Sequence, residues 1–143
     1  MVFGILALAV AAAFAGAAFY VNFAEQPARL ALDDRAMLAQ WKPSYDRGKL
    51  MQASLALIGF LLGALAWWQT SDGRWLAGAV VLVAAWPYTL LVIMPVNRTL
   101  EATRPEAATA ATRLMIERWG FLHAGRTALG LAAMAIFLWA ALR

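Results

Sequence analysis

The sequence predicts an all-α fold, an integral membrane four-helix bundle of up-down topology in a single domain. Of its 143 residues, 64% are hydrophobic and 14% are charged, and the mean hydropathy is +0.67. Soluble domains have about a quarter charged residues, so this chain is expected to lie in a lipid bilayer. Four apolar runs are long enough to cross a bilayer as helices, and the short connections between them favour antiparallel neighbours.

The composition also limits the classes of function. Without cysteine, the chain has no disulfide, iron–sulfur cluster or thiol chemistry. One histidine and no Glu-x-x-His pair make a metal site unexpected, and no cofactor is predicted, although a haem with His123 as its single protein ligand stays open. The net charge of +4 is better explained by basic loops at the membrane surface than by nucleic acid, which is not an expected partner.

The first predicted membrane span covers residues 2–23 and is apolar except for Asn22. A cleaved signal peptide is the alternative, but no basic segment precedes the apolar run, which is also too long for one. We therefore expect a transmembrane helix here. Pro27 follows in the polar connection, where it either kinks the helix or occupies the first turn of a new one.

The other three spans are expected at 48–69, 75–97 and 117–142. Pro87 lies inside the third and predicts a kink near residues 83–87. One face of the second span is polar at one end and small at the other, and consists of Tyr45, Lys49, Gln52, Ala56, Gly59 and Gly63. Small residues let membrane helices approach closely, so this face should pack against the neighbouring helices.

Two polar connections, residues 24–47 and 98–116, join these spans on one side of the membrane. In the first, a short helix is predicted over residues 33–40, with a break at Lys42-Pro43-Ser44. In the second, a surface helix is predicted that Thr103 caps, with proline in its first turn.

The polar residues of the spans gather at one end of the predicted bundle. In an up-down topology, the end of the first helix, the start of the second, the end of the third and the start of the fourth lie on the same side. The residues placed there are Asn22, Glu25, Lys49, Gln52, Asn97, Glu101, His123 and Arg126. This arrangement predicts a polar pocket that opens to one face, with ligand-binding candidates Asn22, Glu25, Tyr45, Gln52 and Trp119.

His123 and Arg126 are one helical turn apart at the start of the last span. Ionisable residues inside a membrane are costly, which makes these two a functional hypothesis with a partner to be found. We expect Arg126 to be paired inside the bundle, with Glu25 as the preferred partner and Asn22 or Asn97 as alternatives. The competing interpretation is a snorkelling arginine beside a histidine that is hydrogen-bonded for packing.

Basic residues predict the orientation in the membrane. Nine of the twelve lysines and arginines lie in or beside the two polar connections, and only Arg74 and Arg143 lie on the far side. Loops rich in lysine and arginine stay in the cytoplasm. We therefore expect a multi-pass protein of a bacterial inner membrane, with the pocket facing the cytoplasm and both termini outside.

The residue set favours acid–base work on an apolar molecule taken from the bilayer. His123 can remove a proton, and Arg126, Asn97 or Asn22 can stabilise the resulting oxyanion. Trp119 and Tyr45 offer ring contacts to an aromatic ligand.

Two other classes of function stay open. One is a small-molecule binding or proton-coupled transport module that uses Glu25, His123 and Arg126. The other is a structural subunit of a larger membrane complex, in which a partner or a lipid fills the pocket. The sequence is also compatible with a homo-oligomer.

Four short motifs carry a resemblance to a known family. They are Asn22-Phe23-Ala24-Glu25-Gln26-Pro27-Ala28-Arg29, Trp41-Lys42-Pro43-Ser44-Tyr45, Pro95-Val96-Asn97 and Trp119-x-x-x-His123-x-x-Arg126. Together they resemble the DUF1772 family of small four-helix membrane proteins, which are similar to anthrone oxygenase-like proteins. The resemblance implies oxidation of a polycyclic phenol by dioxygen without a bound cofactor, through a carbanion that a base creates. It also implies His123, Arg126 and Asn97 as candidate catalytic positions.

Overall fold

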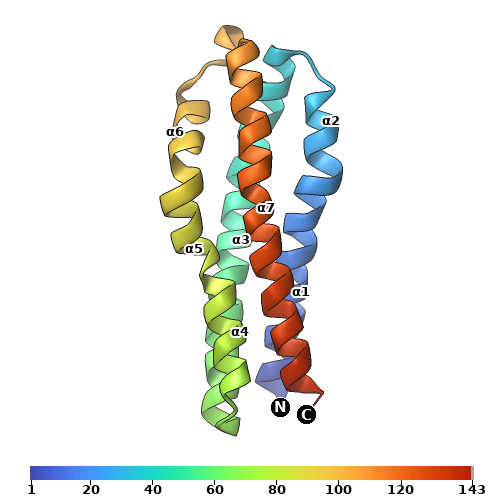
Figure 1. Ribbon diagram of the computed structural model, residues 1–143, viewed down its shortest axis with the longest axis vertical. Helices are drawn as coiled ribbons and strands as arrows, with labels where there is room; N and C mark the ends of the chain where they lie inside the picture. The colour runs from blue at the N-terminus through green and yellow to red at the C-terminus, as the bar shows by residue number, and fades with distance from the viewer. Residues whose placement is uncertain (143) are drawn as a thin grey trace.

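The computed structural model describes residues 1–142 as an antiparallel bundle of four long helical units (Figure 1). The first unit consists of α1 (Val2–Tyr20), η1 (Val21–Glu25) and α2 (Gln26–Leu30), and the second is α3 (Asp34–Thr70). The third consists of α4 (Gly73–Val83), α5 (Ala85–Tyr88), η2 (Thr89–Ile93) and α6 (Met94–Ala102), and the fourth is α7 (Ala110–Ala141), which follows the short η3 (Pro105–Ala107). Each unit is long and apolar enough to cross a membrane.

The predicted all-α, four-helix up-down bundle is confirmed. The chain enters α1 and leaves α7 at the same end of the bundle (Figure 1). Both α1 and α4 pack against α3 and α7, as neighbours in an antiparallel bundle do. Arg143, which is expected on the far side of the membrane, lies outside the described residues.

The half of the bundle that holds the chain ends is closely packed around Phe137. This side chain is fully buried, and it fills the space that two glycines leave on neighbouring helices. A Cβ atom at Gly78 would lie 2.7 Å from the Phe137 ring, and one at Gly63 would lie 2.9 Å from it. The predicted small-residue face of α3 is therefore a packing face, with Ala56, Gly59 and Gly63 all buried.

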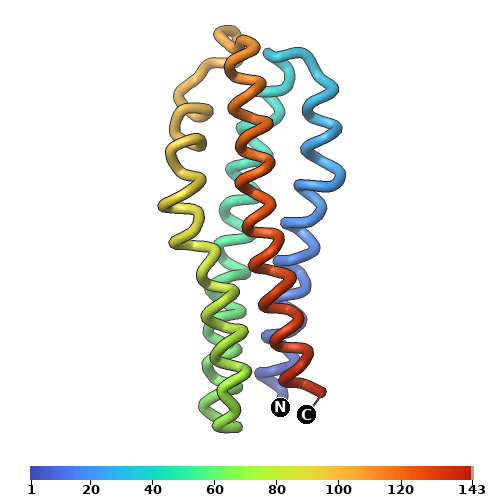
Figure 2. Tube along the Cα trace, viewed as in Figure 1, coloured from blue at the N-terminus to red at the C-terminus, as the bar shows by residue number. Residues whose placement is uncertain are grey.

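The helical segments of the other half spread apart, and α2 and α6 lie on opposite sides of α7 (Figures 1 and 2). Each of these segments follows a π-helical turn and begins with a proline in its first two positions, Pro27 in α2 and Pro95 in α6. Proline has no N–H to donate, and a π-turn shifts the local hydrogen-bond register. Pro27 thus takes the second of its two expected roles, in the first turn of a new helix.

The predicted kink of the third span is also present. A turn at Ala84 separates α4 from α5, inside the expected 83–87 region, and η2 follows. Transmembrane helices tolerate such breaks because neighbouring side chains satisfy the backbone groups that they free.

The predicted break at residues 42–44 is wrong. The helix α3 runs without interruption from Asp34 to Thr70 with Pro43 inside it, and Asp33 caps it by accepting a 2.9 Å hydrogen bond from the Ala36 amide. Proline costs a helix one backbone hydrogen bond. Met37 and Trp41, both fully buried just before Pro43, anchor this end of α3 against the bundle and outweigh that loss.

The surface helix predicted to start at Thr103 is also wrong. Thr103 has extended backbone geometry, and only the short η3 forms after it. Helix α7 begins at Ala110 instead, because Thr109 and Thr112 form a reciprocal capping box there. The polar connections therefore consist mostly of helix that continues the predicted spans, so the helices are longer than those spans.

The glycine packing gives a test of the fold. Gly78→Ala should lower the free energy of unfolding by about 1–3 kcal/mol, since overpacking of a filled core costs this much. The matched control is Gly16→Ala in α1, where a new Cβ would meet nothing within 4 Å, so stability should stay level or rise slightly. Thermal unfolding in detergent measures both, and equal shifts would contradict the packing described here.

Candidate functional site

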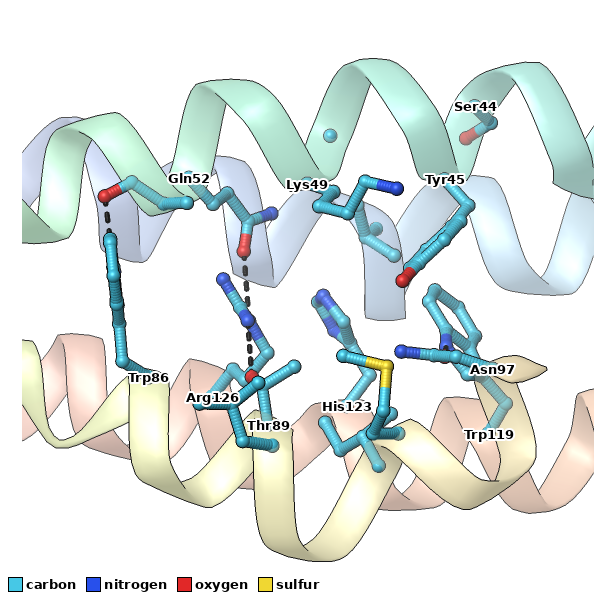
Figure 3. Close-up of a pocket in the computed structure, with 16 residues that line it drawn as sticks. Ser44, Tyr45, Lys49, Gln52, Trp86, Thr89, Asn97, Trp119, His123 and Arg126 are labelled. Atoms are coloured by element: carbon cyan, nitrogen blue, oxygen red, sulfur yellow. Dashed lines mark hydrogen bonds between the residues drawn. The ribbon is translucent and has the colours of Figure 1, made fainter. Parts of the chain in front are cut away.

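A cavity of about 270 Å³ lies between α3, the segment from α5 to α6, and α7 (Figure 3). Its walls are largely apolar. The polar side chains that line it are Ser44, Tyr45, Lys49, Gln52, Thr89, Asn97, His123 and Arg126, and Trp86 and Trp119 add aromatic surface. The structure thus brings six of the eight predicted site residues to one cavity. Asn22 and Glu25 do not line it.

Asn22 instead fixes the orientation of His123. Its Nδ2 donates to the carbonyl of Gly120 at 2.7 Å, which leaves Oδ1 to face His123. Thr127 Oγ1 donates to the same Oδ1 at 2.9 Å, and His123 Nδ1 lies 2.9 Å from it. A carboxamide oxygen only accepts hydrogen bonds, so the proton of a neutral His123 lies on Nδ1.

The other ring nitrogen of His123 is left as a base. His123 is 5% exposed and lines the cavity, and its Nε2 has no hydrogen-bond partner among residues 1–142. With Nδ1 protonated, Nε2 carries the free lone pair. The geometry therefore offers one unprotonated imidazole nitrogen to a molecule in the cavity.

Arg126 lies inside the bundle, so the snorkelling interpretation is wrong for this residue. Its side chain is 8% exposed; Nε donates to Gln52 Oε1 at 3.2 Å and Nη1 donates to Thr89 Oγ1 at 2.5 Å. The guanidinium also lies over the ring of Phe14, 5.6 Å from its centroid. Among the described residues, no carboxylate forms a salt bridge with Arg126.

The expected pairing of Arg126 with Glu25, Asn22 or Asn97 is therefore wrong. Glu25 forms a 3.0 Å ion pair with Arg29, one turn further along its own helical unit, and accepts hydrogen bonds from Gln40 and Ser44. Glu25 lines a neighbouring groove between the first two helical units, which shares part of its wall with the cavity. Residues four apart on a helix meet with less ordering than residues on different helices, so the local partner prevails.

Arg29 is the most deeply buried ionic group that sequence reasoning missed. It is 2% exposed, bonds to Gln26 at 2.8 Å and to Gln40 at 2.5 Å, and lies over the Trp119 ring, 5.5 Å from its centroid. This cluster fastens α2 to α3 next to the cavity. The Glu25–Arg29 spacing was the available signal, and Thr89, which holds Arg126, gave none in the sequence.

Asn97 and Trp119 form the opposite end of the cavity. The Trp119 indole N–H donates to Asn97 Oδ1 at 2.9 Å, and the Trp119 ring lies 5.0 Å from that of His123. Figure 3 shows His123 between Arg126 at one end and Asn97 at the other. The row combines a buried cation, a base and an amide along one apolar-walled cavity.

The fold and site define a small integral membrane protein, a four-helix bundle with a buried histidine–arginine cavity at one end. A family model described as anthrone oxygenase matches residues 41–136, more than half of the chain. The protein belongs to the anthrone oxygenase family, as its motifs predicted. No curated protein and no solved structure matches the chain. The matched range contains every cavity residue named above, whereas Asn22 precedes it.

The two buried arginines should differ in their effect on stability. Arg29→Met leaves the Glu25 carboxylate without its cation and frees α2 from α3, and breaking such a pair costs about 3 kcal/mol. Arg126→Met leaves only the neutral Gln52 and Thr89 without a partner, and it removes a buried charge that is itself costly. The loss of stability should therefore be much smaller than in Arg29→Met. Melting temperatures in detergent, with exposed Arg98→Met as control, compare them; an equal or larger loss in Arg126→Met would contradict the contacts described here.

Proposed function

We propose that the protein is a cofactor-independent oxygenase of an apolar aromatic or polycyclic phenol that enters from the bilayer. The observation that carries this proposal is the buried guanidinium of Arg126, which has no carboxylate partner among residues 1–142 and lines the same cavity as His123, whose Nε2 is free. A buried charge without a counter-ion lowers stability. The buried charge is useful when the substrate supplies the missing anion during the reaction.

The proposed reaction starts with proton transfer. His123 Nε2 takes a proton from a ring methylene that is acidified by a conjugated carbonyl, as in the keto form of the phenol, and the negative charge moves to that carbonyl oxygen. Arg126 stabilises the oxyanion, and the apolar walls strengthen this interaction by keeping the local dielectric low. Asn22 acts as a positioning residue, because it keeps the proton of the resting imidazole on Nδ1.

Dioxygen then supplies the oxidant. The carbanion transfers its electrons to O₂, and the carbon–oxygen bond that forms gives a peroxide, which takes the proton back from His123. Loss of water from this hydroperoxide leaves a new carbonyl on the ring carbon. One O₂ is consumed and one water is released for each methylene oxidised. The protein thus contributes the base, His123, and the oxyanion partner, Arg126, and the substrate reacts directly with dioxygen.

The proton-coupled transport alternative has less support. It needs a carboxylate that exchanges protons next to His123 and Arg126, and Glu25 is instead bound to Arg29, Gln40 and Ser44. A structural subunit would need neither a free imidazole nitrogen nor an uncompensated cation in its cavity. The oxygenase accounts for both.

The catalytic proposal predicts that His123→Gln lowers oxygen consumption with anthrone by about 10²–10⁴-fold, the usual contribution of general base catalysis. Oxygen uptake and quinone absorbance measure the reaction. The melting temperature should change little, because glutamine can keep a hydrogen bond to Asn22.

Exposed Arg98→Gln is the control and should retain full activity. Wild-type protein that neither binds nor oxidises any of a panel of anthrones would sink the oxygenase proposal. Full activity in His123→Gln would remove His123 from it.

We also propose that the cavity end of the bundle faces the cytoplasm of a bacterial inner membrane, since basic residues concentrate there. The chain has no cysteine, so Arg35→Cys and Ser71→Cys each introduce a single thiol, at exposed positions near opposite ends. An impermeant thiol reagent added to intact cells should label only position 71. Labelling at position 35 alone would reverse the orientation.

A further inference from the structure

Asn97 has a hydrogen-bonding group that the protein leaves unused. The residue is 1% exposed, and its Nδ2 has no partner among residues 1–142. A buried N–H without an acceptor is destabilising, and such groups in native proteins usually have a reason. The other buried nitrogen in this condition, Trp41 Nε1, belongs to a residue that does not line the cavity, whereas Asn97 does.

The direction of this N–H is fixed by Trp119. The indole N–H can only donate, so it holds the carboxamide oxygen of Asn97 and turns the nitrogen the other way. Figure 3 shows the Asn97 nitrogen pointing into the cavity, on the side of His123 away from Arg126. The hydroxyl of Tyr45 points into the same part of the cavity.

We infer that Asn97 Nδ2 forms a second oxygen-recognition subsite, which binds a hydroxyl or carbonyl oxygen of the ligand at the end of the cavity opposite Arg126. The inference rests on the proposed function only in requiring an aromatic ligand in the cavity. A ligand oxygen at Arg126 satisfies the buried cation, and one at Asn97 satisfies the buried amide. Asn97 is thereby a specificity-determining residue rather than part of the proton transfer.

The distance between the two ends sets the kind of ligand. Thr89, which holds Arg126, and Asn97 lie on the same helical unit, separated by roughly 12 Å along the axis at 1.5 Å per residue. One oxygen cannot serve both ends. The geometry selects a fused-ring molecule with oxygen substituents on its two outer rings, over one with oxygen at a single end.

Binding of two probes tests this subsite: 2,6-dihydroxyanthraquinone and 2-hydroxyanthraquinone, measured by quenching of tryptophan fluorescence in detergent. Wild-type protein should bind the dihydroxy probe about tenfold more tightly than the monohydroxy probe, the value of one buried hydrogen bond. Asn97→Leu should remove this preference and leave the affinity for the monohydroxy probe within about twofold.

Trp119→Phe is a second variant, which tests the same subsite if Asn97→Leu does not fold. It keeps the ring but removes the donor that orients Asn97, so the preference should fall while Asn97 itself remains. Thr99→Val, an exposed change near Asn97, should keep the full preference.

The outcomes separate this inference from the proposed function. If the monohydroxy probe binds to wild-type protein but the dihydroxy probe binds no better, the subsite is overturned and the aromatic ligand stands. An undiminished preference in folded Asn97→Leu overturns it equally. If no probe binds to wild-type protein, the aromatic ligand and the subsite fall together.

Discussion

The cavity depends on how a guanidinium can be held inside an apolar bundle without a carboxylate. Arg126 is satisfied by a glutamine on α3 and by a threonine in η2, and both are neutral. Dipoles of this kind lower the cost of burial without cancelling the charge. The positive charge therefore remains available inside the cavity, which a salt bridge with Glu25 would have prevented.

The backbone around the cavity is shaped to allow this arrangement. Thr89 begins η2 and Asn22 lies in η1, so both π-turns carry a side chain that holds a member of the histidine–arginine pair. π-Turns in helices occur frequently at functional sites. The other half of the bundle, closed by Phe137 against glycines, supplies the rigid packing from which these less regular segments extend.

Sequence reasoning could find the spans and most of the cavity because membranes impose simple rules. A helix that crosses a bilayer must be long and apolar, so its apolar middle part and the polar residues near its end are visible in the sequence. Side-chain partners obey a different rule, because they depend on which groups meet after folding. Charge alone favours Glu25 as the partner of Arg126, although Arg29 lies one turn away from Glu25 on the same face. Pro43 by itself predicts a break, and the sequence does not show that Trp41 beside it is fully buried and anchors the helix.

The choice of an amide at position 22 also follows from the charge of Arg126. An aspartate there would hold the Nδ1 proton of His123 equally well, and it would make the imidazole a stronger base. It would also place a permanent anion within hydrogen-bond distance of His123 and of Thr127, the residue next to Arg126, whose charge has no carboxylate partner among residues 1–142. This anion would partly cancel the positive potential that stabilises a substrate oxyanion. Asn22 orients the base without adding charge, and the electrostatic preference of the cavity for an anionic ligand is preserved.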